Sequence, residues 1–527
     1  MRSGNHADMD GAAGFAYGMK PDHPLRAALP YIALAAAVLL SYGYEIFNFN
    51  LTIDEELHAI GAVARNVWIA QGRWAMALLN YVLLPSPVGP VTSTFIGVAA
   101  SAVGLFLILR RTLLLDEAGA AAIAALAVTT PTLAFIFTFS TIAYGVGAAF
   151  LAIAVSVQAG GRYSLRGLVL ACALGAFAIG VYQPFALGIA MLAVACALLR
   201  RPERSWPPAR HYGYWLMYVL GSVALYAVAN VLAMKLRSVE SQYVGNFVDL
   251  PGLLHNPRER LETPALQLFA IVRLHPDLFG LRSMWLGVTV GAAAILALVN
   301  PLLRGHLNRT AANFCVLVAV VAIMVMAGAA SPYVLPLRSL VYFPVAVAVI
   351  AAIGYAQSRR HVRMLLLVSC GLAVVGNAAI NNHLFASAAA AEFQDRLLAH
   401  EITRAVRDAY PDLVKGPAPI KVVAVGTMGW PETPIRRVRD TFGASFFEWG
   451  GGLDERTAAY LTLNGLNSVA GAPRDRLRVW RTETSMPAWP RDGWMKMSGD
   501  VLVLKLGEYS PVQRFDLCNL GAKVLCQ

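Results

Sequence analysis

Residues 29–56 read LPYIALAAAVLLSYGYEIFNFNLTIDEE, and this stretch sets the character of the whole chain. Positions 29–49 are almost entirely apolar, and about 20 such residues are the length that an α-helix needs to cross a bilayer. The run is followed by three consecutive acids, Asp54, Glu55 and Glu56. Because no small-residue cleavage site comes close behind the run, it predicts an uncleaved first membrane span.

The rest of the chain repeats this pattern. Of its 527 residues 57% are hydrophobic and 14% are charged, whereas soluble proteins have roughly 25% charged residues. Further apolar runs predict spans at 91–109, 117–137, 139–158, 166–183, 184–200, 211–234, 283–303, 311–330, 339–357 and 364–385. The pattern predicts an all-α polytopic membrane protein with about 11 transmembrane helices. At Pro131 and at Pro184 the sequence fits either one kinked span or two short spans joined by a tight turn.

Basic residues predict the orientation, because Lys and Arg in short loops are kept on the cytoplasmic side. Alternate loops are basic and fall on the side of the N-terminal tail. They carry Arg110, Arg111, Arg162, Arg166, Arg200, Arg201, Arg204, Arg210, Arg304, Arg309, Arg359, Arg360 and Arg363. We therefore expect a cytoplasmic N-terminus. An odd number of spans then places the C-terminal tail on the other side of the membrane.

The predicted domains are a cytoplasmic tail at 1–28, a transmembrane domain at 29–385 with long outer loops at 50–90 and 235–282, and a C-terminal domain at 386–527. In the last of these, helices are expected at 388–410 and 454–463, and strands at 419–426 and 500–506. This indicates a small α/β extracytoplasmic domain. Its Trp430, Trp449, Trp489 and Trp494 fit either a core or a surface that stacks on sugar rings.

The net charge of +12 is explained by topology. Residues 1–385 carry 25 Lys and Arg against 15 Asp and Glu, and residues 386–527 carry 18 against 16. The excess thus belongs to the membrane domain, and no nucleic-acid partner is implied. No phosphate-binding Gly-rich loop or nucleophile elbow is present in the sequence, which disfavours nucleotide-powered transport.

The cysteines agree with this topology. Four lie inside predicted spans, where a thiol is a small apolar side chain. Cys518 and Cys526 lie together near the C-terminus, where an oxidising compartment would favour a disulfide between them; two free thiols remain the alternative.

The acids after the first span are the strongest candidate site. Thr52 and Glu55 have the spacing of a helix capping box, and acids in a first helical turn favour the macrodipole, so a purely structural role is open for all three. A structural role explains Asp54 least well, because acids at a membrane boundary are costly to desolvate. The sequence Gly72-Arg73-Trp74 follows in the same outer loop. Glu45, inside the end of span one, is either functional or reaches out to the interface.

Three other outer segments carry candidate residues. Tyr182 and Gln183 precede Pro184 at an outer turn, where they either hydrogen-bond a polar ligand or satisfy backbone groups that the proline leaves unpaired. Tyr333 and Arg338 lie in the proline-stiffened turn at 331–338, where an outer arginine suits either a phosphate ligand or a lipid headgroup. The loop at 235–282, which includes His255, is expected to form interfacial helices and a wall on the acceptor side. No metal-ligand spacing occurs in the sequence, so we expect no metal and no cofactor.

Together these motifs resemble the integral-membrane glucosyltransferases of the O-antigen serotype-conversion type, which belong to the GT-C class. The resemblance rests on Ile53-Asp54-Glu55-Glu56, on Gly72-Arg73-Trp74, on Tyr182-Gln183, and on Met486-Pro487-Ala488-Trp489-Pro490 before the last strand. It spans nearly the whole chain, although each motif is short.

The resemblance implies a GT-C-like fold and transfer of a sugar, often glucose, from a polyprenyl-phosphate carrier to a surface polysaccharide or glycolipid such as O-antigen. It places the enzyme in the bacterial inner membrane with a periplasmic C-terminal domain. Asp54, with Glu55 and Glu56 as alternatives, would be the general base. Arg338 and Arg73 would bind the donor phosphate, and the expected substrate-binding residues are Trp74, Tyr182, Gln183, His255 and Tyr333.

Two other classes remain open on the sequence alone. A polysaccharide polymerase or ligase would share the spans and the lipid-linked substrate, but it would be expected to rely chiefly on arginines. A lipid-linked glycan transporter would be expected to show internal repeats and polar residues near mid-span.

Overall fold

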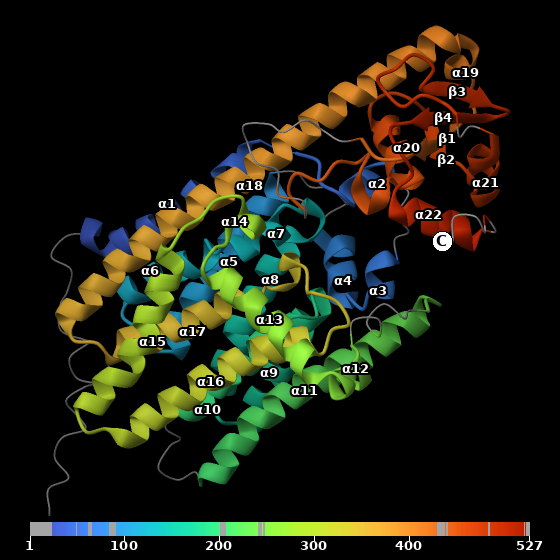
Figure 1. Ribbon diagram of the computed structural model, residues 1–527. Coiled ribbons are helices and arrows are strands. Elements are labelled where there is room, and N and C mark those ends of the chain that lie inside the picture. Colours follow the sequence, from blue (N-terminus) through green and yellow to red (C-terminus); the bar gives the residue numbers. More distant parts are fainter. Residues whose placement is uncertain are drawn as a thin grey trace, which may run out of the picture.

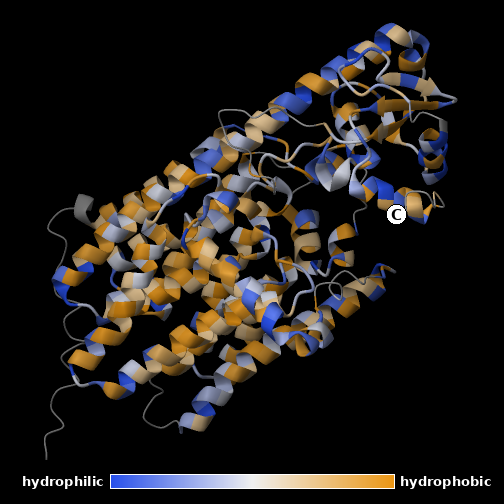
Figure 2. Cartoon of the chain, viewed as in Figure 1, coloured by the Kyte–Doolittle hydropathy of each residue, from blue (hydrophilic) through white to orange (hydrophobic). Residues whose placement is uncertain are grey.

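A computed structural model of the chain describes residues 24–48, 50–61, 66–83, 91–200, 207–240, 245, 248–428, 438, 441–482, 485–520 and 522. A bundle of helices occupies one half of the molecule, and a small domain with a sheet lies at the far end of one long helix (Figure 1). The bundle is predominantly hydrophobic, whereas the small domain mixes polar and apolar residues (Figure 2). The chain is therefore a membrane protein with a small domain of mixed composition beyond the bundle.

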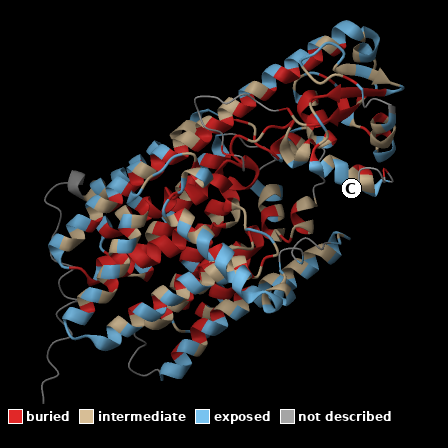
Figure 3. Cartoon of the chain, in the orientation of Figure 1, coloured by how far each residue is buried: buried red, intermediate tan, exposed pale blue. Residues whose placement is uncertain are grey.

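Within the described residues, seven helices are long and apolar enough to cross a membrane. They are α1 (Pro24–Phe47), α5 (Thr92–Leu107) with its π-helical extension η2 (Ile108–Thr112), α8 (Ser140–Gly160), α11 (Pro208–Leu236), α15 (Trp285–Leu303), α16 (Leu307–Ala329) and α18 (Arg360–Ala409). Each matches a predicted span. Their outward faces are exposed while the centre of the bundle is buried, as expected for helices that face lipid (Figure 3).

The other predicted spans are shorter or bent. They correspond to the apolar helices α9 (Leu165–Val181), α10 (Phe185–Leu199) and α17 (Phe343–Gln357) and to the pair α6 (Glu117–Val128) and α7 (Pro131–Phe137). The pair is bent by 62° at its break, where Pro131 cannot donate a backbone hydrogen bond. Length and composition alone thus support seven or eight spans, and the count of eleven stays a prediction.

Small residues bring the central helices together. A Cβ at Gly97 of α5 would collide with the backbone of Ala143 in α8, and one at Gly147 would lie 2.5 Å from the Gly97 carbonyl oxygen. Helices pack this closely in membranes where glycine lets the backbones approach.

Polar side chains brace the break between α6 and α7. The Asn381 amide of α18 donates to the Thr129 carbonyl at 3.0 Å and to the Ser41 hydroxyl at 2.6 Å, and the Tyr42 hydroxyl donates to the Val128 carbonyl at 2.7 Å. These bonds satisfy backbone groups that the bend frees inside the bundle.

The outer loops are largely helical. The loop after α1 contains α2 (Glu55–Ala59), α3 (Val67–Ala70) and α4 (Trp74–Leu83). The loop after α11 contains α12 (Leu250–His255), α13 (Pro257–Val272) and α14 (Pro276–Phe279), and η4 (Leu337–Ser339) precedes α17. Both loops therefore fold into short helices, and the interfacial position expected for those of the loop at 235–282 stays a prediction.

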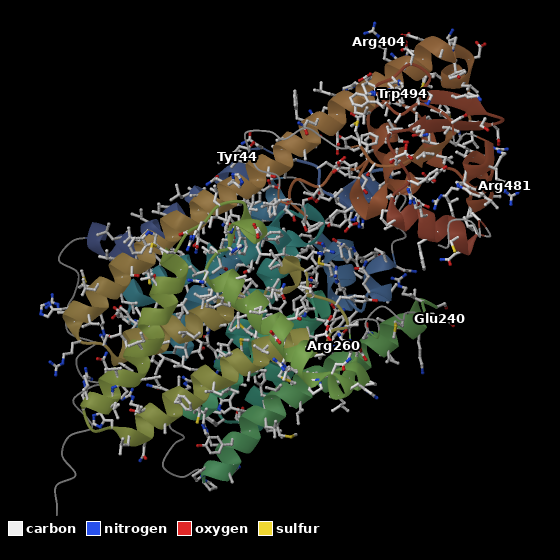
Figure 4. All side chains as sticks on the ribbon, in the orientation of Figure 1. Tyr44, Glu240, Arg260, Arg404, Arg481 and Trp494 are labelled. Atoms are coloured by element: carbon white, nitrogen blue, oxygen red, sulfur yellow. The ribbon has the colours of Figure 1, made fainter. Side chains whose placement is uncertain are left out.

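Helix α18 joins the two parts of the molecule. It runs without interruption for 50 residues, so the boundary that we predict at residue 386 falls inside it. Figure 4 shows Arg404 at its distal end, beside the small domain. On this outer half the Asp395 carboxylate accepts from Phe446 N at 2.7 Å and from Ser445 Oγ at 2.6 Å, which ties the helix to the domain that follows.

That domain has a four-stranded sheet in the order β2-β1-β4-β3. Its elements are α19 (Pro411–Lys415), β1 (Ile420–Val425), η5 (Trp449–Gly451), α20 (Asp454–Leu463), β2 (Ser468–Ala470), α21 (Pro473–Thr482), β3 (Met495–Ser498), β4 (Val501–Lys505) and α22 (Pro511–Asn519). Strand β1 pairs in parallel with β2 and with β4, and Lys421 of β1 lies opposite Val501 of β4. Strand β3 is antiparallel to β4. The two predicted strands correspond to β1 and β4, and Leu398, Ile402 and Val406 of α18 share their buried core.

Candidate active site

The acids form a compact cluster at the outer end of the first span. We call Asp54, Glu55 and Glu56 the acid cluster. Asp54 caps the start of α2 with a left-handed backbone (φ 83°), a conformation that Asp tolerates better than most residues. Glu55 and Glu56 occupy the first helical turn. Asp54 and Glu56 pair with the same guanidinium, whereas Glu55 accepts from Thr52 and Ser140.

Glu55 has a hydrogen bond to each of its carboxylate oxygens. It is fully buried, and its Oε1 accepts from Ser140 N at 2.5 Å and from Ser140 Oγ at 2.6 Å, while Oε2 accepts from Thr52 N at 3.1 Å. Ser140 begins α8, so the carboxylate lies at a positive helix end. Burial raises the pKa of Glu55, and these hydrogen bonds oppose the rise. The bond to Thr52 N is one half of the expected capping box; the Thr52 hydroxyl instead donates to the Thr138 carbonyl at 3.1 Å.

Glu56 is buried, and only one of its two carboxylate oxygens has a hydrogen-bond partner among the described residues. Its Oε1 accepts from an Arg456 amino group at 2.5 Å, and its Oε2 has no hydrogen-bond partner among the described residues. Burial raises the pKa of Glu56 to about 7, and the nearby Arg456 limits the rise.

Asp54 is the accessible member of the cluster. Its side chain is 54% exposed, against 0% for Glu56. Its carboxylate forms an ion pair with the other amino group of Arg456. Of the three acids that the sequence offered as bases, Asp54 is therefore the one that an incoming hydroxyl can reach.

Arg73 lies between two aromatic rings. Its Cζ is 4.6 Å from the centroid of Tyr182 and 5.5 Å from that of Trp68. Trp68 in turn stacks on His58 of α2, with ring centroids 5.6 Å apart and planes 15° from parallel. Burial lowers the pKa of His58. This stack connects the helix that carries the acid cluster to the outer end of α9.

The turn around Gly72-Arg73-Trp74 is fixed from two sides. Gln183 Nε2 donates to the Gln71 carbonyl at 2.6 Å, and the Tyr226 hydroxyl of α11 donates to the Gly72 carbonyl at 3.0 Å. Arg73 Nε, Trp74 Nε1 and Gln71 Oε1 are buried without a hydrogen-bond partner among the described residues. Buried polar atoms are normally paired, so these atoms are suited to a polar ligand.

Arg338 approaches the same region from the turn before α17. The neighbouring Ser339 hydroxyl lies 3.4 Å from the Tyr182 hydroxyl, and Arg338 donates to Thr441 Oγ1 at 3.4 Å. The turn itself is fixed by Arg260, which projects from α13 (Figure 4) and donates to the Ser331 carbonyl at 2.6 Å. Tyr182 thus contacts segments that contain both predicted phosphate-binding arginines.

Two predicted substrate-binding residues lie apart from this group. Tyr333 is 69% exposed, and His255 pairs with the Pro251 carbonyl of its own helix at 2.7 Å. His255 lines an outer-surface hollow of about 590 Å³ that is formed by α12 and α13. Among the described residues, neither side chain is hydrogen-bonded to the acid cluster.

The described tryptophans and the described cysteine of the C-terminal domain have different environments. Trp449, Trp489 and Trp494 pack against its core, as the core-filling alternative expects, whereas Trp430 lies outside the described residues. Cys518 is disulfide-bonded, but Cys526 lies outside the described residues, so their pairing stays a prediction. The described residues contain no group of three His, Cys, Asp or Glu side chains that could hold a metal, and metal independence also stays a prediction.

Sequence reasoning missed Arg456, Trp68 and His58. Arg456 is 402 positions from Asp54, and one arginine among many in a polar tail gives no signal of its partner. His58 and Trp68 were within reach, because both lie in the outer loop that already contained the acids and Arg73.

A helical membrane bundle whose end holds an acid cluster and a half-buried arginine stacked on aromatic rings is typical of a polytopic membrane enzyme. The family model described as Glucosyl transferase GtrII matches residues 43–354, more than half of the chain. The chain belongs to this family and is a glucosyltransferase. The match includes the acid cluster, Arg73, Tyr182 and Arg338, and it ends before Arg456. No curated protein and no solved structure matches the chain.

Proposed function

We propose that the chain transfers glucose from a polyprenyl-phosphate carrier to a surface polysaccharide such as O-antigen, at the outer face of the bacterial cytoplasmic membrane. The observation that carries this proposal is the half-exposed Asp54 at the outer end of the first span, in the same outer loop as Arg73. A lipid-borne donor suits a site at the membrane boundary, because its phosphate lies at the depth of the headgroups.

The distribution of arginines supports this orientation. Arg359, Arg360 and Arg363 lie at the start of α18, and the small domain lies at its other end (Figure 1). Since basic turns are kept in the cytoplasm, the acid cluster and the C-terminal domain would face the periplasm.

The proposed reaction is a direct displacement. The acceptor hydroxyl oxygen attacks the anomeric carbon of the donor, its proton passes to the Asp54 carboxylate, and the bond between the anomeric carbon and the phosphate oxygen breaks with its electron pair leaving on the phosphate. One displacement inverts the anomeric centre. The base must be accessible to the acceptor, which favours Asp54 over the fully buried Glu55 and Glu56.

Arg73 and Arg338 would balance the charge that develops on the leaving phosphate. Positive groups fixed before the reaction stabilise such charge most effectively, because no reorganisation is needed. The two aromatic contacts of Arg73 restrict the guanidinium, and its unpartnered Nε would serve a phosphate or sugar oxygen. Trp74, Tyr182 and Gln183 would line the donor site, while His255 and Tyr333, exposed on α12 and the adjoining turn, would belong to the acceptor side.

The test supplies the purified protein in proteoliposomes with an O-antigen acceptor and one of two labelled donors, polyprenyl-phosphate glucose or UDP-glucose. We expect label in the polysaccharide from the lipid-linked donor alone. Transfer from UDP-glucose without the lipid, or failure of the lipid-linked donor with folded protein, would overturn the proposal.

A further inference from the structure

The acid cluster is closed by a residue from the C-terminal domain. Arg456 lies in the first turn of α20, and its side chain is 11% exposed. One amino group pairs with Asp54 and the other lies 2.5 Å from Glu56 Oε1. A single guanidinium thus bridges two carboxylates that the start of α2 presents side by side, and α2 packs against α20.

The arrangement differs from the domain's internal ion pairs. Arg476 of α21 pairs at 2.6 Å with Asp454 and at 2.8 Å with Glu455, and both acids belong to the same domain. Arg456 instead reaches out of its domain to the loop after the first span. Buried ion pairs contribute little net stability compared with apolar packing, so this pair is better explained by what it does to the acids than by stability.

The contact with Arg456 restricts the orientation of the Asp54 carboxylate. This residue has a left-handed backbone and a half-exposed side chain, so its own helix does little to restrict the carboxylate. A guanidinium offers a rigid planar fork of donors, which fixes a carboxylate in direction as well as in distance. Because Glu56 anchors the same fork from a buried position, the fork is itself held in place.

We propose that Arg456 is a positioning residue of the glucosyltransferase site, and that the site is complete only when the C-terminal domain is docked on α2. The proposal rests on the role proposed above for Asp54. It assigns to the C-terminal domain, which lies beyond the family match at residues 43–354, the task of orienting the base toward the acceptor hydroxyl.

The charged groups around the cluster predict how activity depends on pH. Among the described residues, Arg456 forms the only salt bridges to Asp54 and Glu56. The other titratable groups nearby are Glu55 and His58 on α2 and Glu45 on α1. Arg456 limits the rise in the pKa of Glu56, so without this cation the pKa of Glu56 would rise further. The acid limb of the pH–rate profile should then move to higher pH.

The test compares Arg456→Met and Arg456→Lys with Arg476→Gln, a matched control that breaks an arginine bridge inside the same domain. For Arg456→Met we expect kcat to fall about 10- to 100-fold per folded molecule, the acid limb to rise by about one pH unit, and the KM for the lipid-linked donor to change little. Arg456→Lys keeps the charge and should restore the acid limb but only part of kcat. The control should lower Tm and leave kcat, the acid limb and the donor KM unchanged.

A second arm separates this proposal from the function on which it rests. If Arg456 acts through Asp54, adding Arg456→Met to Asp54→Asn should produce no further loss. Wild-type kcat and an unmoved acid limb in both Arg456 variants, with Asp54→Asn inactive, would overturn the role of Arg456 and leave the proposed function standing. Full activity of Asp54→Asn would instead overturn the assignment of the base. If the Met variant does not fold, the Lys variant alone decides, because the proposal requires its kcat to fall.

Discussion

The Arg73 guanidinium stacks 4.6 Å from the centre of the Tyr182 ring, which joins the outer loop after the first span to the turn between α9 and α10. Through the Ser339 hydroxyl, 3.4 Å from that of Tyr182, the contact extends to the turn that contains Arg338. A cation held against an aromatic face gains about 0.5–2 kcal/mol and loses freedom to move. The stack therefore fixes a positive charge where we place the donor phosphate.

Replacing Arg73 by Lys keeps the charge but removes the planar fork and the stacking. A hydrogen bond to a charged group contributes about 1.5–3 kcal/mol, so we expect the KM for the lipid-linked donor to rise roughly 10-fold or more. Arg258→Lys is the control, because that outer arginine has a side chain that is 96% exposed. Equal donor KM values in the two variants would remove Arg73 from the donor site.

Substitution of Gly180 tests the placement of the Trp74 indole in the donor site. A Cβ at this position would lie 2.6 Å from Trp74 Cε2, so Gly180→Ala must displace the indole ring or the helix. Overpacking of this kind costs about 1–3 kcal/mol, and we expect both a lower Tm and a several-fold lower rate of transfer. Gly291→Ala in α15 is the matched control, since nothing lies within 4 Å of its Cβ. A Gly180→Ala enzyme with wild-type Tm and transfer would contradict the placement of Trp74.

Glu55→Ala should act on stability more than on chemistry. It removes the acceptor for Ser140 N, Ser140 Oγ and Thr52 N, and each buried donor left without a partner costs about 1–3 kcal/mol. We expect a lower Tm of the detergent-purified protein, with transfer per folded molecule much closer to wild type than in an Asp54 variant. An unchanged Tm together with complete loss of transfer would make Glu55 the better candidate for the base.

Glu56 should make stability depend on pH. Its pKa rises from 4.5 to about 7 on folding, chiefly through burial, so between these values the folded state binds more protons than the unfolded state. Stability from this group is fully present below pH 4.5 and is lost as pH rises through about 7, by an amount of up to roughly 3 kcal/mol. Glu56→Gln mimics the protonated form. Its Tm relative to wild type should therefore increase from pH 5 to pH 8, and a difference in Tm that is constant with pH would contradict this.

Much of the membrane domain was predictable because a bilayer constrains local sequence so strongly. Runs of about 20 apolar residues located the long helices, and the sequence 52–56 located the acid cluster. The short helices α9, α10 and α17 and the bend between α6 and α7 could not be settled in this way. The bend is braced by Asn381 of α18, whose amide donates to the Thr129 carbonyl, and no local pattern reveals this contact.

The candidate site was predictable where its residues share one loop or lie beside a proline-marked turn. Asp54 and Arg73 share one outer loop, and Tyr182 and Arg338 are marked by prolines at outer turns. The continuity of α18 across residue 386 was missed because its composition changes from apolar to polar where it leaves the bundle. Arg456 was missed because its partners lie about 400 positions away, a separation that only the folded chain closes.

The most direct test of the central claim is the rate of glucose transfer by Asp54→Asn in proteoliposomes with a labelled polyprenyl-phosphate donor, measured beside Asp277→Asn, another exposed outer aspartate. General bases typically contribute 10²- to 10⁴-fold to a rate. We predict a loss of about that size in kcat for Asp54→Asn, with donor binding retained and with wild-type transfer by the control. Undiminished transfer by Asp54→Asn, and by a variant in which Glu55 and Glu56 are also changed to amides, would contradict the assignment of this acid cluster as the catalytic centre.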